Sequence, residues 1–357
     1  MKLVSIVGAR PQFVKAAPIS RALRAAGHEE FLVHTGQHYD ANLSAVFFEE
    51  LEIPPPDANL CVGSGHHGAQ TAAMLEGLEK MLLAERPDRV LVYGDTNSTL
   101  AGALAAAKLH IPVAHVEAGL RSFNRLMPEE LNRIVADHLS DILLCPSQTA
   151  VDNLKTEGIT RGVHLVGDVM YDAVLQFAQL ARERSTILKE LEIAAGKYLL
   201  ATVHRAENTD DLGHLGNILR AFSQLDESII FPIHPRTRKA IADSADAELH
   251  VSSNVRLMAP VGYLDMLMLE ANARMILTDS GGIQKEAYWL GVPCVTLRDE
   301  TEWVETVAAG WNTLVGANCS RIKNAAKDFR PPADSRPQLY GDGHVAEQCI
   351  RVLEYQA

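Results

Sequence analysis

Short apolar runs rich in β-branched residues recur along the 357-residue chain, and helix-like stretches separate them. This alternation is typical of parallel α/β sheets, whose strands are buried on both faces. The runs span residues 2–7, 31–34, 89–93, 112–116, 142–145 and 164–166 in the first half, then 198–202, 229–233, 255–258, 275–277, 293–297 and 313–315. Six runs in each half predict an α/β protein with two doubly wound, Rossmann-like domains.

The chain is too long for one ordinary core and suits two domains of about 150–200 residues each. We expect a hinge near 167–171, which gives an N-terminal domain over 1–168 and a C-terminal domain over 169–342. Helices are expected at 98–109 and 266–273, and a charged helix at 178–191. The last helix, 345–355, is expected to return with residues 343–357 to the N-terminal domain.

Composition excludes several classes of protein. A hydrophobic content of 47% and a charged content of 22% are those of an ordinary globular protein, not of a disordered or fibrous one. The net charge of -12 argues against a surface that coats nucleic acid or acidic lipid. We therefore expect no nucleic-acid or membrane partner, although a local basic pocket for a phosphate remains compatible with this charge.

The five cysteines show no CxxC spacing, which argues against a zinc site, and we expect no metal. Cys145 and Cys294 lie in apolar runs and are predicted to be buried. An odd, scattered set of cysteines suits a reducing compartment. The chain also shows no apolar segment of the length that a signal peptide or a membrane span requires, so we predict a cytoplasmic protein.

Polar residues follow the apolar runs, at the positions where open α/β sheets bind ligands. The first run leads into Gly8, Arg10 and Pro11, with Lys15 about one helical turn later. A glycine turn into a helix that starts with proline presents free backbone N–H groups, and the two cations add positive charge for an anion. The alternative is a capped surface helix.

Three carboxylates stand at such positions in the first half. Asp95 follows the third run, Glu117 follows the fourth, and Glu129 lies in the first turn of an expected helix. Strand alternation places His115 and Glu117 on one face, and a buried Glu117 needs a partner or a function. Asp95 could instead cap a helix, and Glu129 could complement a helix dipole. Together the carboxylates suggest acid–base chemistry, with pKa values raised by crowding and burial.

The second half places histidine and arginine after two runs. His204 and Arg205 follow 198–202, and His234 and Arg236 follow 229–233. A single histidine is more often structural, but two at equivalent strand ends favour a function. The polar loop that contains Arg298 follows another run, and its alternative interpretation is a solvated turn.

The strongest local signal is the sequence TDSGGIQKE after the run 275–277. A strand, a turn with Ser280, Gly281 and Gly282, and a helix form a cradle for a diphosphate, because backbone N–H groups point outward at a helix N-terminus. Glu286 lies about one and a half turns into this helix, where its carboxylate could hold a ribose by two hydroxyl groups.

Eight motifs occur in order over almost the whole chain, namely GARPQFVK, GDTNSTL, HVEAGLRS, MPEELNR, HRAEN, HPR, TDSGGIQKEA and LRDETEWVE. They resemble the non-hydrolysing UDP-N-acetylglucosamine 2-epimerase family. The resemblance implies the GT-B fold, with a cleft between two Rossmann-like domains, a UDP-sugar substrate and a homodimer. It also implies that no nicotinamide or metal cofactor is used.

The resemblance also implies roles for the residues above. The UDP diphosphate would lie against Ser280, Gly281 and Gly282 with its ribose near Glu286, and His204, Arg10 and Lys15 would close on the phosphates and the sugar. The proton transfers would belong to Asp95, Glu117 and Glu129. Further substrate contacts are expected from Arg121, Arg205, His234, Arg236 and Arg298. Because the C2 proton is not acidic, we expect elimination of UDP to a glycal, followed by re-addition.

Three segments, TGQHYDANLS, RSFNRLMPEE and ATVHRAENTDD, are most similar to the branch that acts on UDP-2,3-diacetamido-2,3-dideoxy-D-glucuronate for surface polysaccharides such as O-antigen. The alternatives are epimerisation of UDP-GlcNAc to UDP-ManNAc, a GT-B glycosyltransferase, a hydrolysing epimerase, or a binder of nucleotide sugars without activity. After Gln37-His38 the chain continues Tyr39-Asp40, unlike the arginine-containing version in enzymes that their substrate activates, so we do not expect activation at a second site.

Overall fold

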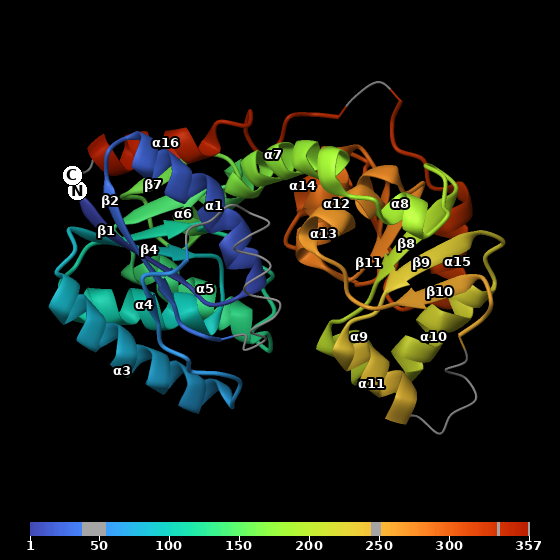
Figure 1. Ribbon diagram of the computed structural model, residues 1–357, viewed down its shortest axis with the longest axis horizontal. Coiled ribbons are helices and arrows are strands. Elements are labelled where there is room, and N and C mark those ends of the chain that lie inside the picture. The colour runs from blue at the N-terminus through green and yellow to red at the C-terminus, as the bar shows by residue number, and fades with distance from the viewer. Residues whose placement is uncertain (38–54, 244–250, 334–335, 356–357) are drawn as a thin grey trace. The chain divides into compact units, whose positions relative to one another are not determined.

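The computed structural model describes residues 1–37, 55–243, 251–333 and 336–355, and of Arg10 only the backbone (Figure 1). The chain divides into two compact units, Met1–Leu175 with Gln338–Ala357, and Gln176–Pro337. The domain boundaries predicted from the sequence, after residues 168 and 342, lie within seven residues of the divisions after Leu175 and Pro337. Each unit contains one parallel sheet with helices packed against it, so the predicted α/β class is confirmed.

The first unit has a seven-stranded sheet in the order β3-β2-β1-β4-β5-β6-β7, in which all paired strands are parallel. The strands are β1 (Lys2–Val7), β2 (Glu29–His34), β3 (Ala58–Asn59), β4 (Arg89–Tyr93), β5 (Val113–Val116), β6 (Ile142–Cys145) and β7 (Val163–Leu165). Strand order reverses direction between β1 and β4. The carboxyl ends of these two strands therefore form the topological switch point, where such sheets bind ligands.

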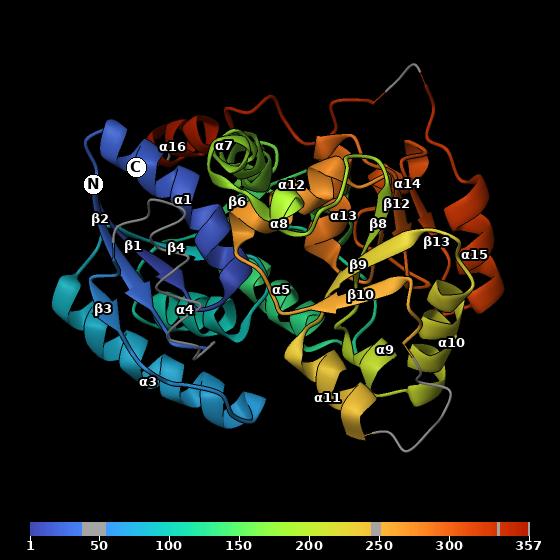
Figure 2. The same cartoon turned by 45° about the vertical axis from the view of Figure 1, so that its right-hand side comes forward.

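Helices cover both faces of this sheet (Figure 1). On one face lie α3 (His67–Glu85), α4 (Asn97–Lys108) and α5 (Pro128–Leu139), whose side chains share a core with alternate strand residues such as Val4 and Ile6. On the other face lie α1 (Arg10–Ala25) and α16 (Val345–Tyr355), and the two pack side by side (Figure 2). Two further helices of the chain are α6 (Gln148–Thr156) and α7 (Val169–Arg184). The last helix thus packs on the first unit.

The second unit repeats this arrangement with a six-stranded parallel sheet, in the order β10-β9-β8-β11-β12-β13. Its strands are β8 (Tyr198–Thr202), β9 (Ser228–Pro232), β10 (Val255–Met258), β11 (Met275–Thr278), β12 (Cys294–Thr296) and β13 (Asn312–Leu314). The switch point of this sheet lies between β8 and β11. Residues at the carboxyl ends of these strands are the ones expected to meet a ligand.

Side chains of β8 alternate between the two faces of the second sheet. Leu199 and Ala201 pack beneath α10 (Leu212–Ser223) and α15 (Cys319–Asp328). Tyr198 and Leu200 pack on the opposite face with α8 (Ile187–Glu190), α12 (Tyr263–Asn272) and α13 (Gly281–Leu290). The remaining helices of this unit are α9 (Ala206–Thr209), α11 (Pro235–Asp243) and α14 (Val304–Ala308).

Each predicted strand is present, with its ends within two residues of the expected ones. Strand β3 was missed because two residues leave no apolar run to detect. The predicted helix 178–191 is wrong in its extent, because α7 begins earlier and ends at Arg184, and the separate short helix α8 follows. Cys145 and Cys294 are buried, as predicted. None of the helices within the described ranges is long and apolar enough to cross a membrane.

Candidate active site

A buried ion pair occupies the switch point of the first unit. Lys15 lies in the second turn of α1, and its Nζ is 2.6 Å from Oε1 of Glu117, which follows β5. The two side chains are 9% and 8% exposed. Gly94, with a φ of +62°, lies against this pair, and a methyl group there would come 3.1 Å from the Lys15 ammonium. The glycine after β4 therefore leaves room for the ion pair. Lys15 is the partner that a buried Glu117 requires.

The backbone amides after β1 are not open to an anion, which corrects the expectation from sequence. The N–H groups of Gly8 and Ala9 donate to Oε1 of Gln12 over 2.8 and 3.1 Å. The Gln12 amide in turn donates to the Tyr93 carbonyl over 2.7 Å. The Gln12 side chain, from the next turn, thus satisfies these two donors. Among the groups that the sequence predicted to bind an anion in this loop, Lys15 remains as a positive charge. The Arg10 side chain lies outside the described residues.

Asp95 is the second acid at this sheet edge, and it also has a cation as its partner. Its Oδ2 lies 2.6 Å from Nη2 of Arg133, a residue of α5 that is almost fully buried. Thr96 is the N-cap of α4, so the alternative that Asp95 caps this helix is wrong. The Asp95 side chain is 33% exposed and thus accessible to a ligand. The sequence led us to expect carboxylates crowded against one another. In the structure, Asp95 and Glu117 are each paired with a cation instead.

Glu129 lies in the first turn of α5, four residues before Arg133. Residues four apart share one face of a helix, so Glu129 lies on the same face as the partner of Asp95. Within the described part of the chain, Glu129 makes no hydrogen bond or ion pair, and its side chain is half-buried. The adjacent Glu130 is buried and accepts the N–H groups of Ser122 and Phe123, which orders the loop before α5.

Glu117 has an unusual backbone conformation, with a φ of +72°. The amides of Glu117 and Ala118 both donate to the Leu144 carbonyl over 3.1 Å. The prediction that His115 and Glu117 share one strand face is wrong, because β5 ends at Val116 and the chain then turns into the left-handed region. A non-glycine residue held in this region is strained, and such strain is concentrated at functional sites.

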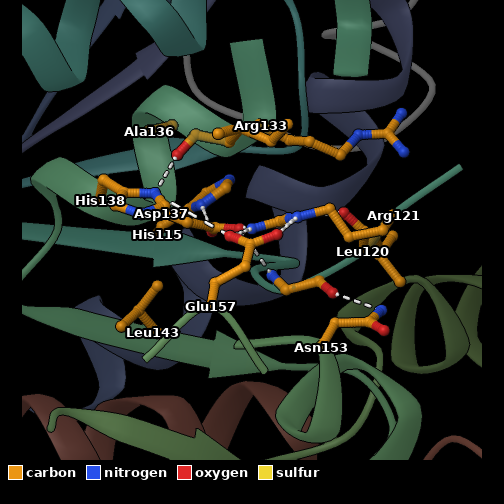
Figure 3. Close-up of polar contacts among 12 residues, drawn as sticks. His115, Leu120, Arg121, Arg133, Ala136, Asp137, His138, Leu143, Asn153 and Glu157 are labelled. Atoms are coloured by element: carbon orange, nitrogen blue, oxygen red, sulfur yellow. Dashed lines mark hydrogen bonds and ion pairs between the residues drawn. The ribbon is translucent and has the colours of Figure 1, made fainter. Parts of the chain in front are cut away.

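Arg121 is bound within the first unit (Figure 3). Its Nη1 donates to Asp137 over 2.7 Å, and its Nε and Nη2 donate to both oxygens of Glu157 over 2.7 and 2.8 Å. Burial lowers the pKa of Arg121, but the two carboxylates outweigh this and raise the pKa above its ordinary value. Sequence reasoning expected a substrate contact here. The geometry instead gives Arg121 a supporting role.

In the second unit, Asp279 organises the loop that carries His204. Asp279 is fully buried at the end of β11, and its carboxylate accepts the backbone N–H groups of His204 and Arg205, each over 3.0 Å. It also accepts the side-chain amide of Asn208 over 3.1 Å. Sequence reasoning did not single out Asp279. The signal was present, because this acid directly follows an apolar run in the motif TDSGG.

The start of α13 is open to an anion. Ser280 is the N-cap, and the first intrahelical bond runs from the Gln284 amide to the Ser280 carbonyl. The amides of Gly281 and Gly282 precede this bond and have no acceptor within the helix. Gly282 is exposed, whereas a methyl group at Gly281 would come 3.3 Å from Nε1 of Trp303. Two adjacent amides at a helix N-terminus can accept an anion, and the diphosphate cradle at Ser280, Gly281 and Gly282 stays a prediction.

One arginine and one acid border this helix start. Nη2 of Arg205 and Oε2 of Glu302 would each lie 3.8 Å from a methyl group at Gly281. Arg298 follows β12, is 3% exposed and pairs with Glu302 at 3.1 Å. The interpretation of the Arg298 loop as a solvated turn is therefore wrong for its arginine.

His204 lies within this basic environment and is 35% exposed. Burial is the main cause that lowers the pKa of its imidazole. The Asp279 carboxylate, 3.3 Å from Nδ1, opposes the shift, and nearby guanidinium groups add to it. These groups belong to Arg205, Arg236 and Arg298. A ring of this kind gains a proton more easily once an anion is bound beside it.

Three other predicted residues have different surroundings. The ring of His234 is exposed, with its centroid 5.6 Å from that of His204. Arg236 lies on the surface, where its guanidinium pairs with Asp210 at 2.6 Å. Glu286 is buried and accepts the Tyr263 hydroxyl over 2.9 Å.

We based the prediction that the substrate does not activate the enzyme at a second site on Tyr39 and Asp40. These two residues lie outside the described part of the chain.

Two Rossmann-like units, with paired acids at one switch point and open amides among arginines at the other, define an enzyme that acts on nucleotide-linked substrates. The family model described as UDP-N-acetylglucosamine 2-epimerase matches residues 21–354. A UDP-N-acetylglucosamine 2-epimerase homolog of Methanococcus maripaludis is 56% identical over 355 residues, which cover 99% of each chain. The chain therefore belongs to the UDP-N-acetylglucosamine 2-epimerase family, whose non-hydrolysing UDP-sugar 2-epimerases are isomerases.

Two further comparisons bear on the substrate and the fold. The UDP-2,3-diacetamido-2,3-dideoxy-D-glucuronate 2-epimerase of Pseudomonas aeruginosa is 49% identical over 365 residues, which cover 100% of this chain and 99% of that protein. The crystal structure of Methanocaldococcus jannaschii UDP-GlcNAc 2-epimerase in complex with UDP-GlcNAc and UDP has a TM-score of 0.91 and 45% identity, and covers 99% of this chain and 100% of that one. The predicted family and GT-B-like fold are thus confirmed.

Proposed function

We propose that this enzyme inverts C2 of UDP-2,3-diacetamido-2,3-dideoxy-D-glucuronate and supplies the mannuronate epimer for surface polysaccharide such as O-antigen. The Pseudomonas aeruginosa relative, named for this reaction, supports the choice through 49% identity over the whole chain. Three sequence segments, named above, support the same branch. The second candidate is the epimerisation of UDP-GlcNAc to UDP-ManNAc, which the names of the Methanococcus and Methanocaldococcus relatives favour.

In this proposal the second unit binds the UDP group. The diphosphate accepts the amides of Gly281 and Gly282 and the Ser280 hydroxyl, while nearby arginines and His204 balance its charge. These donors also stabilise UDP as the leaving group, because negative charge grows on the β-phosphate as the bond to C1 breaks. Glu286 is proposed to hold the ribose. His234 and Arg236 retain outer roles in the same basic surface.

The first unit supplies the acids in this proposal. The C2–H bond of the sugar is not adjacent to a carbonyl, so a carboxylate cannot remove the proton at a useful rate unless the C1–O bond breaks with it. A carboxylate takes the proton, the C–H electron pair forms the C1=C2 double bond, and UDP leaves with the C1–O electron pair. A second acid then delivers a proton to the other face of C2 while UDP re-adds at C1.

The observation that carries this proposal is the arrangement of acids around Gly94. Glu117 and Lys15 lie against this glycine, and Asp95 is the next residue in the chain, paired with Arg133. Two carboxylates with cationic partners at neighbouring strand ends suit two proton transfers. We assign Asp95, Glu117 and Glu129 to proton transfer, and Lys15 with Arg10 to the charge of the substrate.

The test is turnover in deuterium oxide with each UDP-sugar in a separate incubation, followed by NMR of the products. We expect the epimer of the diacetamidoglucuronate to carry deuterium at C2, with no free sugar accumulating. An unlabelled epimer would exclude proton transfer with solvent. Release of free sugar with UDP would identify a hydrolysing enzyme, and release of UDP only with an added acceptor would identify a glycosyltransferase.

We infer that the protein is a cytoplasmic homodimer. The resemblance to the family supports the dimer. The five free cysteines support the cytoplasm, because free thiols suit a reducing compartment, and the proposed UDP-sugar substrate agrees with that location. Light scattering after size exclusion measures the assembly directly. A monomer at micromolar concentration would contradict the inference about the dimer and leave the proposed reaction intact.

A further inference from the structure

A buried histidine links the two strand ends that carry acids. His115 lies in β5 and is fully buried. Its Nε2 is 2.7 Å from the Gly94 carbonyl. Its Nδ1 is 2.7 Å from Oδ1 of Asp137 on α5 (Figure 3). A carbonyl oxygen can only accept a hydrogen bond, so Nε2 carries a proton. The proposed chemistry described above gives this ring no role.

The second ring nitrogen faces the Asp137 carboxyl group, with Nδ1 2.7 Å from Oδ1. Oδ2 of Asp137 accepts the Gly119 amide over 3.1 Å and an Arg121 N–H over 2.7 Å. Burial acts to raise the pKa of Asp137, but its bonds to His115 and Arg121 outweigh that effect and lower the pKa. His115 therefore bridges the Gly94 carbonyl and Asp137 through its two ring nitrogens.

The ring and its partner hold both acid-bearing turns. On one side the Nε2 bond fixes the Gly94 carbonyl, which belongs to the peptide that leads into Asp95. On the other side Asp137 fixes the Gly119 amide, at the end of the turn that holds Glu117 at a positive φ. Gly119, with a φ of +81°, packs closely against the next element, since a methyl group there would lie 2.4 Å from the Ala150 carbonyl oxygen.

We propose that His115 is a positioning residue for the epimerisation, whose two ring nitrogens hold the ends of β4 and β5 in register so that Asp95 and Glu117 face the same C2 atom. The proposal rests on the proposed function of this site. Arg121 and Glu157 complete the cluster, because Arg121 gives Asp137 a cationic partner and Glu157 balances the charge of that guanidinium. The ring touches no substrate in this proposal.

The test separates the contacts of the two ring nitrogens. In His115→Gln the side-chain amide reaches the position of Nε2 and can still donate to Gly94. In His115→Asn it reaches the position of Nδ1 and donates only to Asp137. We expect kcat to fall less than about tenfold for Gln and about 100-fold for Asn, because misplacement of acids by about an ångström has effects of this size. KM and UDP affinity should stay unchanged in both.

A third variant and a matched control protect the test against failed folding. Asp137→Asn removes the carboxylate that faces Nδ1 while Nε2 still donates to Gly94, and we expect it to behave like His115→Gln. His138→Gln and His138→Asn are the controls, because His138 is the exposed neighbour of Asp137 on α5. Its Nδ1 is 2.9 Å from the Ile134 carbonyl and 4.0 Å from a Glu157 oxygen that Arg121 already holds. The controls should keep wild-type kcat.

The outcomes are distinct. Equal losses in the Gln and Asn variants that parallel their loss of melting temperature would show a packing role and overturn the proposal. An Nε2 atom without a proton in 15N NMR of labelled wild-type protein would overturn it too, without any need for activity. Wild-type protein that leaves both UDP-sugars unchanged would instead overturn the proposed function, while the NMR experiment still reports on the ring.

Discussion

The two units share one strand order, yet their switch points carry opposite chemistry. In the first unit, acids follow the central strands, and each has a cationic partner, Glu117 with Lys15 and Asp95 with Arg133. In the second unit, a serine–glycine turn opens its amides among arginine side chains. The shared topology provides a place for a ligand, and the residues at the strand ends decide what is done there.

The comparison also shows that an acid at a strand end is not catalytic by position alone. Asp279 ends a central strand of the second sheet, as Asp95 does in the first, but it is fully buried and its oxygens accept backbone and side-chain amides. Asp95 is one-third exposed and holds a single guanidinium. Availability of the carboxylate oxygens distinguishes the acid that can transfer a proton from the acid that orders a loop.

The largest effect is expected from removing the charge of Glu117. Glu117→Gln should lower kcat by about 1,000-fold, because general acid–base groups contribute on this scale, while UDP affinity stays unchanged. The measurement is turnover by NMR together with calorimetric titration of UDP. The melting temperature should fall as well, since Lys15 is left buried without its partner.

Asp279→Asn is the matched change in the second unit, and it should show the opposite pattern. The new amide would place N–H donors against the amides of His204 and Arg205, which costs about 1–3 kcal/mol of stability. UDP affinity should fall with the order of this loop. If Glu117→Gln abolished UDP binding, or Asp279→Asn lost only kcat, the division of roles between the units would be wrong.

A tenfold effect is expected at the start of α13. Gly282 is exposed, and among the described residues a methyl group there meets Ser280 Oγ alone, at 3.9 Å, so Gly282→Ala fits the fold. The methyl group would occupy the space of the diphosphate, and we expect UDP to bind about tenfold more weakly. Gly68→Ala is the control, because Gly68 is also the second residue of a helix and its methyl group meets no atom of the described part of the chain within 4 Å.

Both alanine variants should gain stability, by up to about 1 kcal/mol, because glycine is unfavourable in a helix. Thermal denaturation without ligand tests that gain, and titration with UDP separates the two positions. Equal UDP affinities would mean that the amides of α13 do not carry the diphosphate.

A smaller effect is expected from pH through His204. Its folded-state pKa is lowered from 6.5, so the unfolded chain binds more protons below that value, and stability falls as the pH decreases from 6.5 through the folded-state pKa. A bound diphosphate favours the protonated ring. UDP-sugar binding should therefore take up a fraction of a proton at pH values between the pKa of His204 in the free enzyme and its higher pKa in the complex, and the affinity for the UDP-sugar should increase as the pH falls.

Calorimetry in buffers of different ionisation enthalpy measures this uptake, and a UDP-sugar is the suitable ligand because its diphosphate does not titrate in this range. His204→Gln should abolish the uptake. An uptake that persists in this variant would assign the proton to another group.

Sequence reasoning located the strands and the acids at their ends, because buried strands appear as apolar runs and ligands bind after them. It missed the polar cluster on α5, where the usual pattern is inverted. Glu130, Arg133 and Asp137 are buried on this helix, whereas Leu131 and Val135 are 43% and 39% exposed. Hydrophobic periodicity assigns such a helix the wrong face.

The sequence pattern therefore did not reveal Asp137 and Arg133 as the partners of His115 and Asp95. The acids Asp95 and Glu117 themselves could be found, because they follow apolar runs. The use of Gln12 to satisfy the amides of Gly8 and Ala9 was invisible for a related reason. A side chain that folds back on its own turn leaves no trace in residue spacing.

The smallest effect is expected at Arg236, which sequence reasoning placed with the substrate contacts. Arg236 is 46% exposed, and its partner Asp210 is 64% exposed. A surface pair of this kind contributes little, so Arg236→Gln should change UDP affinity by less than about threefold. The same change at Arg205, whose guanidinium borders Gly281, should weaken UDP binding by about tenfold.

The pair of arginine variants sharpens the description of the second switch point. Both arginines add to the positive field that lowers the pKa of His204, so a small loss at Arg236 reflects this long-range charge. Raising the salt concentration should remove the loss at Arg236 and leave most of the loss at Arg205, because exposed charges are screened and direct contacts much less so. An Arg236 effect that equals the Arg205 effect at high salt would place Arg236 on the diphosphate, as the sequence first suggested.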